Sequence, residues 1–100
     1  MKDLRDLQRM AKEMQAGMER AQAQLADETV EGTAGGGAVT VVMTGTQEAQ
    51  SVRISPDAVD PTDVETLQDL VLAATRDALA KSKELASAKL GGITGGLKLP

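Results

Sequence analysis

Apolar residues near the N-terminus recur at alternating intervals of three and four residues. They are Leu4, Leu7, Ala11, Met14, Met18, Ala21 and Leu25. This heptad spacing places them on one side of a helix, and the intervening Lys, Glu, Gln, Arg and Ala residues favour helix formation. We therefore predict a helix over residues 2–27. At about 1.5 Å per residue, 25 residues span roughly 37 Å, whereas a compact domain of this size has a radius of gyration near 13 Å. The helix should extend beyond its own domain or lie along a partner.

After residue 28 the apolar residues alternate with a period of two, which is typical of strands. We predict strands over residues 29–34, 38–44 and 48–55, separated by Gly35-Gly36-Gly37 and by Gly45-Thr46-Gln47. The alternation places Val39, Val41 and Met43 on one face of the second strand. One apolar and one mostly polar face indicates an antiparallel three-stranded meander.

A second helix is predicted over residues 61–90. Asp60 is the expected N-cap and Pro61 the first-turn residue, since both types favour helix starts. One face of this helix carries Val64, Leu67, Val71, Ala74, Ala78 and Leu85, broadened by Leu70 and Leu79. Gly91-Gly92 should end the helix, leaving residues 91–100 as a flexible tail. The chain is thus predicted to be a single α+β domain over residues 1–100.

The apolar residues are unusually small for a chain that must build its own core. Of 41 hydrophobic residues, 15 are Ala, and Trp, Tyr and Phe are absent. Burying an Ala methyl group yields little free energy compared with a Leu side chain. We therefore expect an obligate homodimer whose second subunit supplies the missing burial. The residues expected in the dimer interface or the core are Leu4, Leu7, Met14, Met18, Leu25, Val41, Val52, Ile54, Leu67 and Val71.

The missing residue types also limit the chemistry. Without His or Cys the chain has no imidazole acid–base group, thiol nucleophile, zinc site or disulfide. Asp57, Asp60 and Asp63 are better explained as helix-capping residues than as a metal site, and neither glycine cluster has a phosphate-loop context. We expect no enzyme activity, no cofactor and no metal. No membrane span or secretory signal is visible, so the expected location is the cytoplasm.

Charge is distributed unevenly, although the net value is −4. Residues 57–69 contain five acids and no Lys or Arg, whereas two basic groups lie elsewhere. The first is Lys2, Arg5, Arg9 and Lys12, and the second is Lys81, Lys83, Lys89 and Lys98. The first group is spaced three, four and three residues apart, so it forms one stripe. Such a stripe suits DNA phosphates, but it also suits a solvated face paired with Asp6 and Glu13. Both interpretations stay open at this point.

Several short motifs occur in an order that resembles one known family. They are Val-Glu-Gly-x-Ala-Gly-Gly-Gly at residues 30–37, Pro-Asp-x-Val-Asp-Pro at residues 56–61, and Thr-Gly-Gly-Leu at residues 94–97. Together with the Met- and Gln-rich first helix, they resemble the YbaB/EbfC family of bacterial nucleoid-associated proteins over nearly the whole chain. The resemblance implies a tweezer-like homodimer with projecting helical arms that binds double-stranded DNA in the nucleoid. Members are often encoded beside clamp-loader or recombination genes, which suggests replication or recombination proteins as further partners.

The leading hypothesis is therefore an architectural or regulatory protein that contacts DNA phosphates. Its candidate DNA-binding residues are the two basic groups given above. The alternative is a protein-interaction adaptor in replication or recombination with little direct DNA binding. The acidic surface favours this alternative, because nucleic-acid-binding proteins are usually basic.

Overall fold

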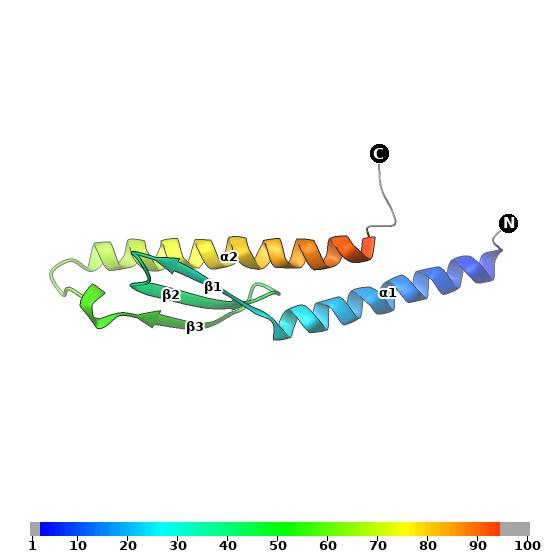
Figure 1. Cartoon of the computed structure of the whole chain (residues 1–100), viewed down its shortest axis with the longest axis horizontal. Coiled ribbons are helices and arrows are strands. Elements are labelled where there is room, and N and C mark those ends of the chain that lie inside the picture. The colour runs from blue at the N-terminus through cyan, green and yellow to red at the C-terminus, as the bar shows by residue number, and fades with distance from the viewer. Residues whose placement is uncertain (1–2, 95–100) are drawn as a thin grey trace, which may run out of the picture.

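A computed structural model describes residues 3–94 as two long helices joined through a small antiparallel sheet (Figure 1). The elements are α1 (Leu4–Asp27), β1 (Thr29–Ala34), β2 (Val39–Thr44), β3 (Ala49–Ile54), a short 3-10 helix η1 (Pro56–Ala58) and α2 (Val64–Thr94). The strands lie in the order β1-β2-β3, and α2 runs along one face of the sheet. The predicted α+β class, with its antiparallel meander between two long helices, is confirmed.

Helix α1 begins at Leu4, two residues later than predicted, because Asp3 is its N-cap. The Asp3 carboxylate accepts a hydrogen bond of 3.0 Å from the backbone N–H of Asp6. Of the heptad residues only Ala21 and Leu25 are buried, so α1 packs on the rest of the chain at its C-terminal end. The molecule measures 71 × 27 × 16 Å, with a radius of gyration of 19.6 Å. The predicted extension beyond the domain is confirmed.

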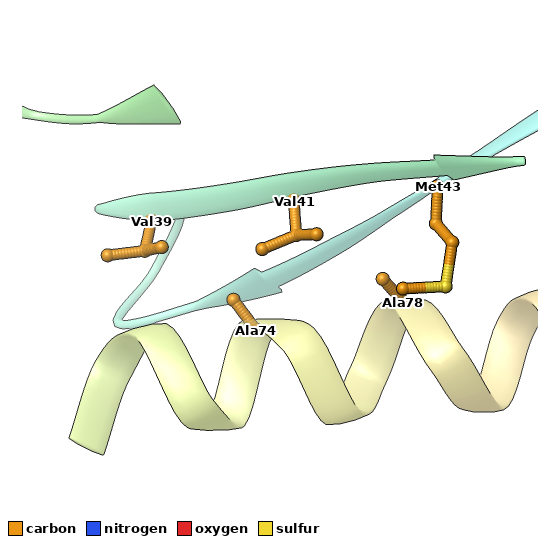
Figure 2. Packing of buried hydrophobic residues seen from close by; sticks show 5 residues of the cluster. All are labelled: Val39, Val41, Met43, Ala74 and Ala78. Atoms are coloured by element: carbon orange, nitrogen blue, oxygen red, sulfur yellow. The ribbon is translucent and has the colours of Figure 1, made fainter. Parts of the chain in front are cut away.

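The core lies between β2 and α2. Val39, Val41 and Met43 point from β2 towards Ala74 and Ala78 of α2, as Figure 2 shows, and all five are buried. The predicted inward face of the second strand is therefore confirmed. The two alanines are spaced four residues apart, so they lie on the same face of the helix and give it a strip of small side chains.

Strand β1 lies unusually close to α2, and Gly32 makes this approach possible. A Cβ atom at Gly32 would overlap the backbone nitrogen of Ala78 and the carbonyl oxygen of Ala74, and would lie 2.6 Å from the Ala78 Cα. Small residues at the contact, Gly32 on β1 with Ala74 and Ala78 on α2, therefore let the backbones of the strand and the helix approach closely.

The start and the end of α2 differ from the prediction. The helix begins at Val64, and its N-cap is Asp63, which accepts from the backbone N–H of Thr66 at 3.3 Å and from its hydroxyl at 2.7 Å. Asp60 instead caps the preceding turn through Thr62. Gly91 and Gly92 do not end the helix, which continues to Thr94. A glycine costs only about 1 kcal/mol in a helix, which a long cooperative helix tolerates. Of the predicted tail, residues 95–100 lie outside the described residues.

Strand β3 is more exposed than predicted. The second and third strands are also shorter than expected, at residues 39–44 and 49–54. Val52 and Ile54 pair with Val41 and Val39 and so share the core-facing side of the sheet, yet they are 50% and 40% exposed. They are not core residues of the single chain, because α2 packs against β1 and β2 and leaves β3 uncovered, and their place in a dimer interface stays a prediction.

Candidate nucleic-acid interface

The first basic group lies on the part of α1 that projects from the molecule. We call residues 4–16 the arm. Arg5, Arg9 and Lys12 are exposed on it, whereas Lys2 lies outside the described residues. The Arg9 Nη2 lies 3.6 Å from the Asp6 Oδ1, and the Arg9 Nε lies 4.0 Å from the Glu13 Oε1. Exposed ion pairs of this kind contribute little to the free energy of folding. Within residues 3–94, Arg5 and Lys12 form no ion pair, so their charges are available to a ligand.

Lys81 of the second group is a structural residue. Its Nζ donates to the backbone carbonyl of Glu31 at 2.9 Å and pairs with the Asp77 carboxylate at 3.1 Å. The same carboxylate accepts from the backbone N–H of Thr33 at 3.0 Å. The Thr33 hydrogen bond, followed by that from Lys81, lowers the pKa of Asp77 below its usual value. These contacts fasten α2 to β1 and engage the Lys81 charge.

Lys89 ties the end of α2 to α1. Its Nζ donates to the Gln24 amide oxygen and to the Glu28 carboxylate, both at 3.1 Å, and its side chain is only 24% exposed. The other carboxylate oxygen of Glu28 is buried without a hydrogen-bond partner among the described residues. Lys89 thus holds the two helices together where they diverge, and a carboxylate offsets its charge.

We expect Lys89→Gln to lower the free energy of unfolding by about 1 kcal/mol, because a partly exposed ion pair is lost and Glu28 remains half-buried. Urea titration followed by circular dichroism measures this change. Lys83→Gln is the control, since Lys83 is exposed on the same helix and forms no ion pair within residues 3–94. Equal stability of the two variants would contradict the structural role.

Two exposed arginines lie outside both predicted groups. Arg20 lines an open groove of about 350 Å³ between α1 and the end of α2, together with Gly17, Ala21, Gln24 and Lys89. Arg76 is exposed on α2 seven residues before Lys83, a spacing of two turns that places both on one face. This seven-residue spacing from Lys83 is the sequence feature by which Arg76 could have been predicted as a further candidate residue. Lys98, the last predicted residue of the second group, lies outside the described residues.

One group of acidic residues lies at the opposite end of the molecule from the arm. Asp57, Asp60 and Asp63 belong to the segment before α2, at the end of the molecule away from the free end of α1 (Figure 1). Hydrogen bonds from Thr62 and Thr66 lower the pKa values of Asp60 and Asp63 respectively, as expected for capping carboxylates. Over residues 3–94 no group of acidic side chains is arranged to hold a metal ion. Nor does any helix in this range have the length and apolarity needed to cross a membrane.

A second exposed surface is apolar and lies on the sheet side of α2. A groove of about 420 Å³ is lined by Leu67, Gln68, Val71, Leu72 and Thr75. Asp77 and Lys81 fasten the other flank of α2 to β1, so helical geometry turns this groove towards β3. We call Val52, Ile54, Leu67, Val71 and Leu72 the body surface. Leu67 and Val71 are half-buried, as residues at the edge of an uncovered core would be.

Nearly the whole chain matches known proteins in sequence. A family model described as the YbaB/EbfC DNA-binding family matches residues 1–97. A nucleoid-associated protein of Roseiflexus sp. (strain RS-1) is 54% identical over 96 residues, covering 96% of this chain and 95% of that protein. A nucleoid-associated protein of Chloroflexus aurantiacus is 54% identical over 94 residues, covering 94% of each.

A solved structure shares the fold. The crystal structure of an uncharacterized protein from Helicobacter pylori superimposes with a TM-score of 0.79 over 98% of this chain and 100% of that chain. The two sequences are 19% identical, so this likeness bears on the fold alone.

Proposed function

Because this chain belongs to the YbaB/EbfC DNA-binding family, we propose that it binds double-stranded DNA as a homodimer, through phosphate contacts made by its arms. The relatives are named nucleoid-associated proteins, and we assign this chain the same location. Its role is then architectural or regulatory. The observation that carries the proposal is the pair of unengaged cations, Arg5 and Lys12, on a helix that projects from the molecule.

The arm is suited to the DNA backbone in length and charge. Its 13 residues span roughly 20 Å, and Arg20, four residues further along α1, adds an exposed cation at its base. Arg9 joins by exchanging its weak, exposed pairs with Asp6 and Glu13 for a phosphate. Phosphate contacts release condensed counterions, which supplies affinity without sequence information.

The net charge of −4 is compatible with this proposal because of where the acids lie. The molecule is 71 Å long, whereas the Debye length is about 10 Å at 0.1 M salt. Acids at the far end are therefore screened from DNA that is bound at the arms. The positions of the charged residues along the molecule, rather than its net charge, therefore determine its interaction with DNA.

The body surface supports the homodimer part of the proposal. Val52 and Ile54 lie on the core-facing side of β3, where a second layer would normally cover them. A second subunit seated there would bury both residues and fill the neighbouring groove on α2. This would supply the burial that the Ala-rich composition lacks.

A salt series on a labelled duplex tests the proposed function. The label belongs on the DNA, because the chain has no Trp or Tyr. Fluorescence anisotropy should show binding that weakens steeply with salt, with a logarithmic slope of about 0.9 per phosphate contacted. Light scattering should show a dimer. An acidic protein from outside the family is the control.

Absence of binding at low salt, from a chain shown to be folded and dimeric, would favour the adaptor alternative. The acidic residues of segment 57–69 are the observation in favour of that alternative, because nucleic-acid-binding proteins are usually basic. Recovery of a replication or recombination protein after nuclease treatment would then support it.

The double variant Arg5→Gln/Lys12→Gln should bind at least about tenfold more weakly at moderate salt, and the salt slope should fall by about 3.6, because two phosphate contacts are lost in each of the two subunits. The loss should be similar on unrelated duplexes, because backbone contacts carry no sequence information. Arg53→Gln is the control, since Arg53 lies on the sheet and pairs with Glu31 at 3.2 Å. An unchanged slope in the double variant would remove the arm from the interface.

A further inference from the structure

The arm carries an apolar strip that its own chain does not cover. Leu4 is 69% exposed and Leu7 is 54% exposed, and Ala11 and Met14 are exposed as well. We call these four residues the arm seam. The same strip continues into Ala21 and Leu25, which are buried against the rest of the chain. The seam is therefore half of a helix-packing surface that extends past the point where intramolecular packing ends.

The residues that flank the seam indicate what kind of partner covers it. In a two-stranded coil the positions beside the seam usually carry charges that select the partner. Along the arm these positions hold Gln8, Met10, Gln15 and Gly17, none of them charged, and the one charged residue beside the seam is the N-cap Asp3, at its end. The charged residues of the arm lie on its far side: Asp6 and Glu13, with the cations Arg5, Arg9 and Lys12. Two identical seams can therefore meet without repulsion between like charges.

The sizes of the seam residues favour an antiparallel arrangement. Antiparallel pairing centred on Arg9 places Leu4 opposite Met14 and Leu7 opposite Ala11 of the second copy. Each large residue then meets a smaller or more adaptable one, which fills the space evenly. Parallel pairing would place Ala11 opposite Ala11 and leave a gap between two leucine-sized layers.

We propose that the arm seams of neighbouring dimers pair in this antiparallel way on DNA. This inference rests on the proposed function, since DNA brings the dimers together. Four side chains, one of them alanine, bury little apolar area, so the contact is weak between free dimers. Binding side by side raises the effective concentration of the two arms to the millimolar range or so. Arg5 and Lys12 point away from the seam and stay available to phosphates. The expected consequence is cooperative binding to long DNA.

Comparison of a short and a long duplex tests the proposal. The short duplex accommodates one dimer and the long duplex accommodates several. Leu4→Gln/Leu7→Gln should leave affinity for the short duplex within about twofold, because no phosphate contact changes. On the long duplex the variant should lose cooperativity, with a Hill coefficient near one and about tenfold weaker half-saturation. The matched control is Ala16→Gln, at an exposed position of the arm outside the seam.

Two results of this comparison would overturn the proposal. In the first, Leu4→Gln/Leu7→Gln retains wild-type cooperativity on the long duplex. In the second, the variant is monomeric by light scattering, which would make the seam part of the primary dimer interface.

A second experiment tests the seam without DNA, so its outcome is separate from that of the proposed function. The chain has no cysteine, so an introduced thiol is unique. Leu7→Cys and Ala11→Cys chains, mixed at high protein concentration and oxidised, should form a mixed disulfide in greater yield than either variant alone. The control is a separate mixture of Leu7→Cys with Ala16→Cys, oxidised under the same conditions. Equal yield with the control, or greater yield from either variant alone, would exclude the antiparallel seam contact.

Discussion

Replacing Gly32 with valine should leave the chain unable to fold stably. The backbone of β1 lies directly on that of α2, and a Cβ atom at Gly32 would overlap backbone atoms of Ala74 and Ala78. Backbone atoms cannot move aside as a flexible side chain can, so strand and helix would have to separate. The expected loss is at least about 3 kcal/mol, which is a large part of the stability of a small domain. Urea titration followed by far-ultraviolet circular dichroism measures it, since the chain lacks Trp and Tyr.

Gly91→Ala is the matched control for this prediction. Gly91 lies within α2, and a Cβ atom there meets nothing within 4 Å. Alanine should therefore stabilise the helix by about 1 kcal/mol or less, because it has the higher helix propensity. If Gly32→Val and Gly91→Ala both retained wild-type stability, the close approach of β1 and α2 would be refuted.

The second large effect is expected at the base of the arm. Leu25 is 1% exposed, and its backbone carbonyl accepts the N–H of Gly45 at 2.9 Å. Leu25→Ala should lower the free energy of unfolding by about 2–4 kcal/mol, because it removes buried methyl groups and leaves a cavity. The same urea titration measures this loss.

Leu7→Ala serves as the control for Leu25→Ala. Leu7 occupies the same heptad strip but is exposed, so its truncation should change stability by only about 0.5 kcal/mol. Losses of similar size at Leu7 and Leu25 would mean that the whole strip is buried in solution. The contrast between the two leucines therefore reports where intramolecular packing of α1 ends.

Local patterns accounted for most of the secondary structure. The heptad spacing identified α1, and the alternation of Val39, Val41 and Met43 identified β2 and its inward face. Such patterns are readable because neighbouring residues determine which side of an element is apolar. The structural roles of the glycines were predicted less accurately. Gly91 and Gly92 lie inside α2, since their cost in a helix is small, whereas Gly32 has a packing role that no local pattern signals.

The candidate site could be predicted only in part. Spacing placed Arg5, Arg9 and Lys12 together on one face, as the arm shows. It did not distinguish cations available to a ligand from those used in packing. Lys81 and Lys89 are engaged with Glu31 and Glu28, which lie 50 and 61 residues away in sequence. Contacts across such separations depend on how the helix is laid on the sheet, which the sequence around each lysine does not contain.

Sequence alone sufficed to determine the α+β class and the long projecting helix α1, because helix periodicity acts within a few residues. Tertiary structure was needed to decide which apolar residues are covered. Helix α2 packs on β1 and β2, so Val39 and Val41 are buried while their strand partners Ile54 and Val52 remain exposed. The physical reason is that burial depends on what lies above a face of the sheet. The close contact of α2 with Gly32 determines which strands the helix covers, and this contact joins residues that lie far apart in the sequence.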